Sequence, residues 1–314
     1  MDERDIRIFC ALAITGPPEP VPTGPVRGLG ALARDLGLDE KTVRVRLRRL
    51  EGEGFIKYYQ AAPNLSLLGE GAELTCRFES INVATKLEGL AFARQQTGMV
   101  EALDFLGTTF AVTVAAADEA AAAAVQQRIA RHAELTRFEQ GTRLLPRPDV
   151  PVSALDWRII ERLRYDGHAP AEEVARTLGI TPRMVRYRLS KLVRGHAVEI
   201  RPVIDARKQT GVVLFRLAVR TEERSRSEVL ARLRRTFGER VWAARLSLAG
   251  PILLDLFGFS LADSEDAAVR ALAVPGVQSC TSLVLKEVVE PDHPSWVDRR
   301  IAELAVRSDR VPRR

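Results

Sequence analysis

The residues of this sequence that could do chemistry are arginines and lysines at helical spacing in two segments, 39–50 and 181–194. Guanidinium and ammonium groups on an exposed helix face can bind phosphate oxygens and hydrogen-bond to the edges of DNA bases. We expect two sets of contacts, assigned from their positions along each helix. The base-edge candidates are Lys41, Thr42, Arg183 and Met184, and the phosphate or base candidates are Arg44, Arg46, Arg186 and Arg188.

The residues between these side chains predict the helices that would present them. In the later segment Val185, Leu189 and Leu192 recur at helical intervals and form one apolar face. Thr181 suits the N-cap, and Pro182 suits the first helical position, where its missing N–H costs nothing. A short helix precedes each segment. A short helix, a tight turn and a basic amphipathic helix are typical of a helix-turn-helix, whose last helix enters the major groove.

An alternative is that these charges only face solvent, which is the usual role of exposed arginine and lysine. Their recurrence at equivalent positions in two segments favours a shared task. The second region is also more basic, with seven basic and two acidic residues from Leu178 to Arg207, whereas Met1 to Glu70 holds ten basic and ten acidic residues. We therefore expect the second region to contribute more of any attraction to phosphates.

The whole chain repeats itself at an offset of about 142 residues, for example at Leu36-Gly37-Leu38 and Leu178-Gly179-Ile180. Prolines in 145–151 mark the junction between the copies. After each basic helix and wing strand, the pattern predicts strand, helix, strand, strand, helix, strand, which is ferredoxin-like (RAM/ACT-like). The predicted fold is α+β, with two tandem copies of a winged helix-turn-helix plus a βαββαβ sensor domain. The predicted domains are a first winged helix-turn-helix at 1–70, its sensor at 71–147, a second winged helix-turn-helix at 152–207, its sensor at 210–290, and a C-terminal helix and tail at 291–314.

The first copy resembles the helix-turn-helix and wing of the Lrp/AsnC (feast/famine) regulators. The resemblance rests on Leu36-Gly37-Leu38-Asp39, Val43, Arg46-Leu47, Arg49-Leu50-Glu51 and Gly54-Phe55-Ile56, and it is looser in the second copy, where His196-Ala197 replaces the Gly-Phe pair. It implies double-stranded DNA as partner, transcriptional regulation as function, and sensors that pair within the chain as a pseudo-dimer. An amino acid or other small effector stays open, because both copies lack the aspartate of the family's Gly-x-Tyr-Asp turn. A further homo-oligomer also stays open.

Composition excludes several classes of protein. No window reaches the ~18 apolar residues of a membrane span, and the N-terminus lacks a secretory signal, so we expect a cytoplasmic protein. Cys10, Cys76 and Cys280 lie too far apart for a thiolate zinc site, and no metal or cofactor is expected. Gly16 to Arg27 holds five prolines and predicts a rigid surface loop absent from the second copy.

Two other classes of function compete with the regulator. One is an enzyme similar to the Lrp-like sirohaem decarboxylases, which include fused tandem forms. None of the four histidines pairs with another histidine or a carboxylate at catalytic spacing, and only His196 is placed to face a pocket; these four are His132, His168, His196 and His293. We therefore expect no enzyme activity and no catalytic residue. The other class is a sensor or scaffold that does not bind DNA.

Overall fold

The computed structural model describes residues 1–13 and 29–307. The predicted proline-rich loop at 16–27 and the tail at 308–314 lie outside these described residues. The chain divides into two compact units, each built from both halves of the sequence. The sensor unit comprises α1 (Glu3–Ala13) with Glu70–Leu144 and Asp205–Asp292. The helix-turn-helix unit comprises the described residues 29–69, Leu145–Ile204 and the C-terminal part from His293. The predicted boundaries between four separate domains stay a prediction.

The sensor unit contains two segments with the predicted order of strand, helix, strand, strand, helix, strand. The first consists of β2 (Ala72–Glu79), α4 (Val83–Arg94), β3 (Met99–Phe105), β4 (Thr109–Ala116), α5 (Glu119–His132) and β5 (Thr136–Leu144). The second consists of β7 (Val213–Thr221), α9 (Arg226–Phe237), β8 (Val241–Arg245), β9 (Ile252–Gly258), α10 (Leu261–Leu272) and β10 (Val277–Val289). The mixed α+β class is confirmed, whereas an origin by tandem duplication stays a prediction.

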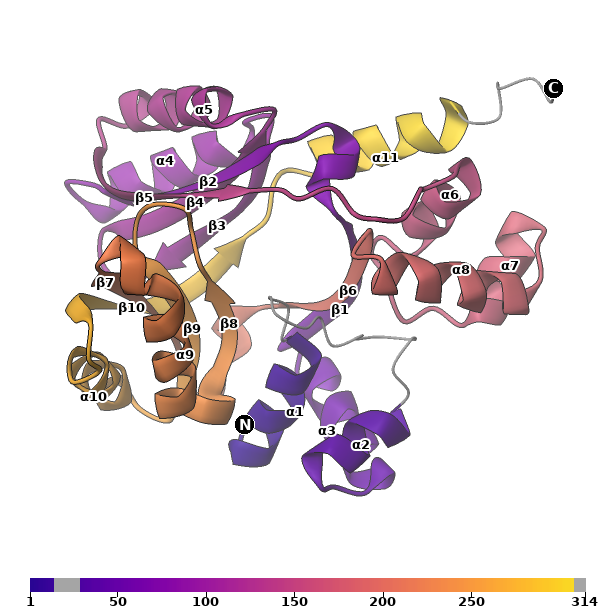
Figure 1. The fold of residues 1–314 in the computed structure, drawn as a ribbon, viewed down its shortest axis with the longest axis horizontal. Coiled ribbons are helices and arrows are strands. Elements are labelled where there is room, and N and C mark those ends of the chain that lie inside the picture. Colours follow the sequence, from indigo (N-terminus) through magenta and orange to yellow (C-terminus); the bar gives the residue numbers. More distant parts are fainter. Residues whose placement is uncertain (14–28, 308–314) are drawn as a thin grey trace. The chain divides into compact units, whose positions relative to one another are not determined.

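The two segments share one eight-stranded antiparallel sheet in the order β5-β2-β4-β3-β10-β7-β9-β8 (Figure 1). Within each segment the four strands follow the ferredoxin-like order. The segments join where β3 pairs with β10, with Leu285 opposite Phe105 and Val289 opposite Ala102. We call this β3–β10 pairing the seam.

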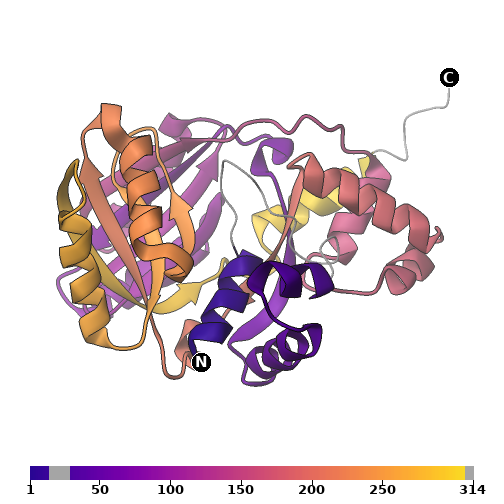
Figure 2. The ribbon, with the colours of Figure 1, turned by 60° about the horizontal axis from the view of Figure 1, so that its bottom comes forward.

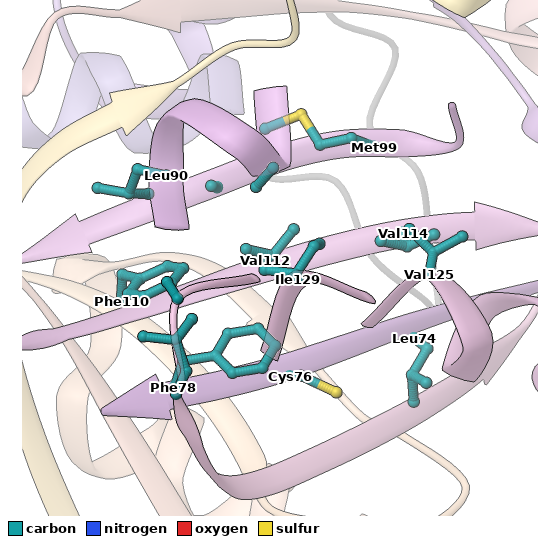
Figure 3. Close-up of a cluster of buried hydrophobic side chains, with 14 of the residues drawn as sticks. Leu74, Cys76, Phe78, Leu90, Met99, Phe110, Val112, Val114, Val125 and Ile129 are labelled. Carbon is teal, nitrogen blue, oxygen red and sulfur yellow. The ribbon is translucent and has the colours of Figure 1, made fainter. Parts of the chain in front are cut away.

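Alternating burial along the strands places a separate apolar core under the helices of each segment. In β2, Leu74, Cys76 and Phe78 point to the same face and pack with Phe110, Ile129 and other buried side chains under α4 and α5 (Figure 3). This alternation is what the two-residue period of a strand requires when only one face is covered by helices. The second segment repeats the arrangement under α9 and α10 with its own cluster: Leu217, Val219, Val229, Leu233, Leu254 and Ala271.

Ion pairs join the two sensor segments at the seam and beyond it. Asp104 is almost fully buried; its Oδ1 lies 2.7 Å from Lys86 Nζ and its Oδ2 lies 2.8 Å from Lys286 Nζ. Two further pairs join the segments, Arg245–Glu101 at 2.5 Å and Arg220–Glu139 at 2.9 Å. In these three pairs the carboxylate belongs to the first segment and the cation to the second. Arg94 at the end of α4 and Asp292 just after β10 form a pair of the opposite polarity, at 2.9 Å.

Helix α1 (Glu3–Ala13) belongs to the sensor unit, although the sequence analysis assigned it to the first helix-turn-helix. Its Phe9 ring packs against Trp242 and Phe257, with ring centroids 5.9 and 5.5 Å apart. The amphipathic pattern predicted a helix correctly but could not identify the surface that covers its apolar face.

The helix-turn-helix unit holds the basic helices and the wings of both halves. Its elements are α2 (Leu29–Leu36), α3 (Glu40–Gly52), β1 (Ile56–Pro63), α6 (Ala154–Arg162), α7 (Ala171–Leu178), α8 (Pro182–Arg194), β6 (Val198–Ile204) and α11 (Trp296–Arg307). The wings β1 and β6 pair antiparallel, from Ile56 opposite Ile204 to Pro63 opposite Val198. We call this two-stranded sheet the wing ribbon.

The turn between α6 and α7 rests on the wing ribbon. Gly167, in this turn, is not among the glycines with positive φ. Its N–H donates to the Tyr59 carbonyl at 2.7 Å, and a Cβ at this position would lie 2.9 Å from the side chain of Ile200. Glycine is therefore required by the close approach of the backbone and not by its dihedral angles.

Replacing Asp104 by asparagine should lower the free energy of unfolding by about 3–5 kcal/mol, because the ammonium of Lys86 stays buried without its counter-charge. Urea denaturation of the full chain measures this. The matched control is Asp266→Asn on the exposed surface of α10, which should change stability by less than about 0.5 kcal/mol. Similar small effects in both variants would contradict a structural role for Asp104.

Candidate nucleic-acid interface

Local chemistry defines the ends of α6 and α8 and thereby the orientation of the basic side chains. Ser153 and Asp156 form a reciprocal capping box at the start of α6. Gly179 ends α7 in the left-handed conformation, and the Thr181 side chain then caps α8 with Pro182 at its first position. The cap and proline predicted for α8 are thus both present.

The outward face of α8 is basic and exposed. Val185, Leu189, Leu192 and Val193 are buried, which leaves five cationic side chains and no acidic one along the helix: Arg183, Arg186, Arg188, Lys191 and Arg194. Arg183 and Met184 are exposed in the first turn, as a base-edge contact requires. Tyr187 is 69% exposed on the same helix and was not among the predicted contacts. Its position in the sequence, outside the apolar face of the helix, could have predicted this exposure.

Two arginines of α8 have different surroundings. Arg186 pairs with Glu172 of α7 at 2.8 Å, both side chains are well exposed, and the hydrogen bond from Arg186 lowers the pKa of Glu172. An exposed pair of this kind is weak, so Arg186 can exchange its partner for a phosphate. Arg188 instead lies 3.0 Å from the buried Asp156 and 3.1 Å from Ser153 Oγ. Arg188 therefore joins α8 to the capping box of α6.

The predicted contacts in α3 are more strongly engaged within the protein. The Thr42 hydroxyl donates to the capping carboxylate of Asp39 at 2.5 Å, and Arg44 pairs with Glu40. Arg46 is only partly exposed, whereas Lys41 is exposed. Helix α3 has five basic and two acidic residues, so it carries less net positive charge than α8. The expected asymmetry in attraction to phosphates stays a prediction.

The histidines differ from expectation at two positions. His196 does not line a pocket; it is exposed at φ 55°, and its counterpart in the first copy is Gly54 at φ 77°. His293, expected to lack a carboxylate partner, lies 3.3 Å from Asp298 and 3.1 Å from the Tyr165 hydroxyl. Burial alone would raise the pKa of Asp298, but hydrogen bonds from Tyr165 and Arg164 lower it. This cluster forms where α6 contacts α11, and its members come from two parts of the chain that are far apart in sequence.

Two kinds of feature are absent from residues 1–13 and 29–307. No group of three or more histidine, cysteine or carboxylate side chains is arranged to hold a metal ion. No helix is both long and apolar enough to cross a membrane. A cavity in the sensor unit, between Arg77, Glu139 and Arg216, has a volume of about 20 Å³, which suits a water molecule and not an amino acid.

Comparison with known proteins identifies the segment that contains α6, α7 and α8. Residues 153–193 match the family model of the AsnC-type helix-turn-helix domain. The chain carries an AsnC-type helix-turn-helix. The resemblance to this family is thereby confirmed, but it lies in the second copy, where we expected the looser match. In the first copy the segment 14–28 separates the first two helices, so the three-helix spacing differs.

Solved structures match at two scales, and no curated protein matches the chain. The crystal structure of the siroheme decarboxylase NirDL covers 95% of this chain and 98% of its own, at 14% identity and a TM-score of 0.53. NirDL in complex with an iron-uroporphyrin III analogue matches equally, at 15% identity, with the same coverage and a TM-score of 0.53. E. coli AsnC covers 43% of this chain and 92% of its own, at 18% identity and a TM-score of 0.35.

These findings correct the expectation that the chain is not an enzyme. That expectation is wrong, because the fold that spans 95% of the chain is the fold of a decarboxylase. It rested on the spacing of histidines along the sequence, which does not report on contacts such as those of His293. Likeness at this level of identity shows the fold and leaves the reaction of this chain to experiment.

Replacing Arg188 by alanine should lower the free energy of unfolding by about 1–3 kcal/mol, because the buried carboxylate of Asp156 loses its cationic partner. Chemical denaturation of the full chain measures the change. Arg183→Ala, which removes the same charge from an exposed position of the same helix, should be close to neutral. Equal stability of the two variants would show that Arg188 does not support the fold.

Proposed function

We propose that the chain is a transcriptional regulator that binds double-stranded DNA, with α8 as its main reading helix. The observation that carries this proposal is the basic face of α8, with five cations and no acidic residue, inside a domain of the AsnC helix-turn-helix type. Such a helix matches the charge of the phosphate backbone and the width of the major groove.

The predicted contacts divide into three roles under this proposal. Arg183 and Met184, in the first turn of α8, face base edges, and Arg186 binds phosphate after releasing Glu172. Arg188 holds α8 on α6 and contacts DNA only indirectly. Lys41, Thr42, Arg44 and Arg46 of α3 form a second and weaker contact region, because three of them already have partners in the protein.

The sensor segments serve as an intramolecular pseudo-dimer under this proposal. The shared sheet and the ion pair of Lys286 with Asp104 at the seam support pairing within one chain. A small effector and a cytoplasmic location remain part of the proposal. If an amino acid regulates this protein, it binds outside the cavity beside Arg216, which is too small for it.

The variants Arg183→Ala and Arg186→Ala should weaken binding to a duplex selected from a random-sequence pool. Loss of a base contact at Arg183 should cost about 1–3 kcal/mol and relax the preference at one position, whereas loss of a phosphate contact at Arg186 should lower the salt slope by about 1. Lys41→Ala should have a smaller effect. Fluorescence anisotropy over a series of salt concentrations measures all three.

Arg128→Ala in the sensor unit is the matched control, since it removes the same charge outside the helix-turn-helix unit. It should leave affinity and salt slope unchanged. Failure of the wild-type chain to bind any duplex at low salt would refute the proposal and favour a sensor or scaffold without DNA binding.

A second candidate function is decarboxylation of a tetrapyrrole, and the match to NirDL over nearly the whole length of both chains favours it. This match includes both units, whereas the helix-turn-helix family model includes only residues 153–193. The two functions make separable predictions, because DNA binding requires the exposed cations of α8 and decarboxylation does not.

Incubation of the full chain with siroheme under reducing, oxygen-free conditions tests the second candidate. A decarboxylase should shift the absorbance of the tetrapyrrole on binding and release carbon dioxide, with mass spectrometry detecting the lost carboxyl groups. Arg183→Ala should retain this activity in full. An unchanged spectrum and unchanged substrate mass would contradict the second candidate.

A further inference from the structure

A basic hollow lies on the helical side of the second sensor segment, away from the sheet. Helices α9 and α10 run side by side there (Figure 1, Figure 2). The hollow has a volume of about 510 Å³, within the range of sites that hold small molecules. Its lining consists of Arg232, Arg235 and Thr236 of α9, Arg270 of α10, and the segment 273–275 that follows α10.

Two of the three arginines are held in place by the protein. Arg270 donates to the Thr236 carbonyl at 2.8 Å and stacks over the Phe237 ring, with its Cζ 5.1 Å from the ring centroid. Arg232 donates to the Pro275 carbonyl at 2.9 Å and to Glu228 at 2.5 Å. These bonds occupy only part of the five N–H donors of each guanidinium. The remaining donors are therefore preoriented for a ligand.

The hollow keeps a net positive charge after the nearby negative charges are counted. No acidic side chain belongs to the described lining, and Glu228 offsets one of the three arginines. The C-terminal ends of α9 and α10 contribute about −0.5 charge each. The balance is about +1, and exposed Arg235 has no ion-pair partner among the described residues. Compensation of the negative helix C-termini therefore does not explain why three arginines gather here.

The first sensor segment does not share this feature. Counted from the N-caps Asn82 and Ser225, the counterparts of Arg232 and Arg235 are Gly89 and Phe92. Counted from Asp118 and Ser260, the counterpart of Arg270 is Arg128. Two of the three cations are thus specific to the second segment, although both segments have the same fold. A requirement of the fold would have placed them in both.

We propose that this hollow binds a small anion with two or more oxyanion groups, either phosphates or carboxylates. Planar guanidinium groups match both kinds of group through paired hydrogen bonds. Ala273, Val274 and Pro275 provide an apolar floor for the part of the ligand that joins the anionic groups. This site is separate from the cations of α8 and does not depend on DNA binding.

Isothermal titration calorimetry on the full chain at constant ionic strength tests the site with inorganic pyrophosphate and with citrate, and acetate serves as the monovalent control. Binding of pyrophosphate alone assigns a phosphorylated ligand, and binding of citrate alone assigns a polycarboxylate. Arg235→Ala should weaken the bound anion at least about tenfold, since a charge-assisted contact is lost. Arg235 is exposed, so this variant should unfold at the wild-type temperature.

Arg128→Ala, at the equivalent place in the first sensor segment, should bind like the wild type. The proposal is wrong if neither anion binds more tightly than acetate, or if Arg235→Ala leaves binding unchanged. It is also wrong if Arg128→Ala weakens binding as much, which would indicate general charge attraction. Weaker DNA binding by Arg235→Ala without binding of either anion would assign the hollow to DNA phosphates instead.

Discussion

The buried carboxylate of Asp104, held between Lys86 of one sensor segment and Lys286 of the other, is the interaction on which the sensor unit depends. A buried charge is tolerated only when its partners are complete, and here the partners come from both segments. The pairing of β3 with β10 brings them together, and the ion pairs of Glu101 and Glu139 repeat the same polarity. Backbone pairing makes the sheet continuous, and the buried ion pair adds a contact that needs one lysine from each segment.

The two halves share an architecture but differ in where they carry positive charge. In the helix-turn-helix unit, α8 has no acidic residue, whereas α3 has two and keeps Thr42 and Arg44 bound to neighbours. In the sensor unit, α9 and α10 surround a basic hollow that α4 and α5 lack. The second half thus concentrates the cations that can meet external anions, and the first half supplies the acidic side of the seam.

Patterns local in sequence predicted most elements correctly. The cap and proline of α8, the strand order of each sensor segment and the outward position of Arg183 all follow from interactions between near neighbours. Features that depend on distant contacts were missed: the covering of Phe9 by Trp242, the ion pair of Arg188 with Asp156, and the contact of His293 with Asp298. Helical periodicity shows that a side chain lies off the apolar face, but it does not show whether a distant helix has already engaged its charge.

The wing ribbon limits how the lengths of the two wing strands can change during evolution. Because β1 and β6 share one ladder of backbone hydrogen bonds, a one-residue insertion in either strand would turn every following side chain to the opposite face. Tyr59 and Ile200, which enclose Gly167, lie on different strands, so an insertion in one strand would move its residue out of register with the other. A bulge can absorb such a change, as it does between Ile56 and Tyr58, and elsewhere a change of length in one wing needs a matching change in the other.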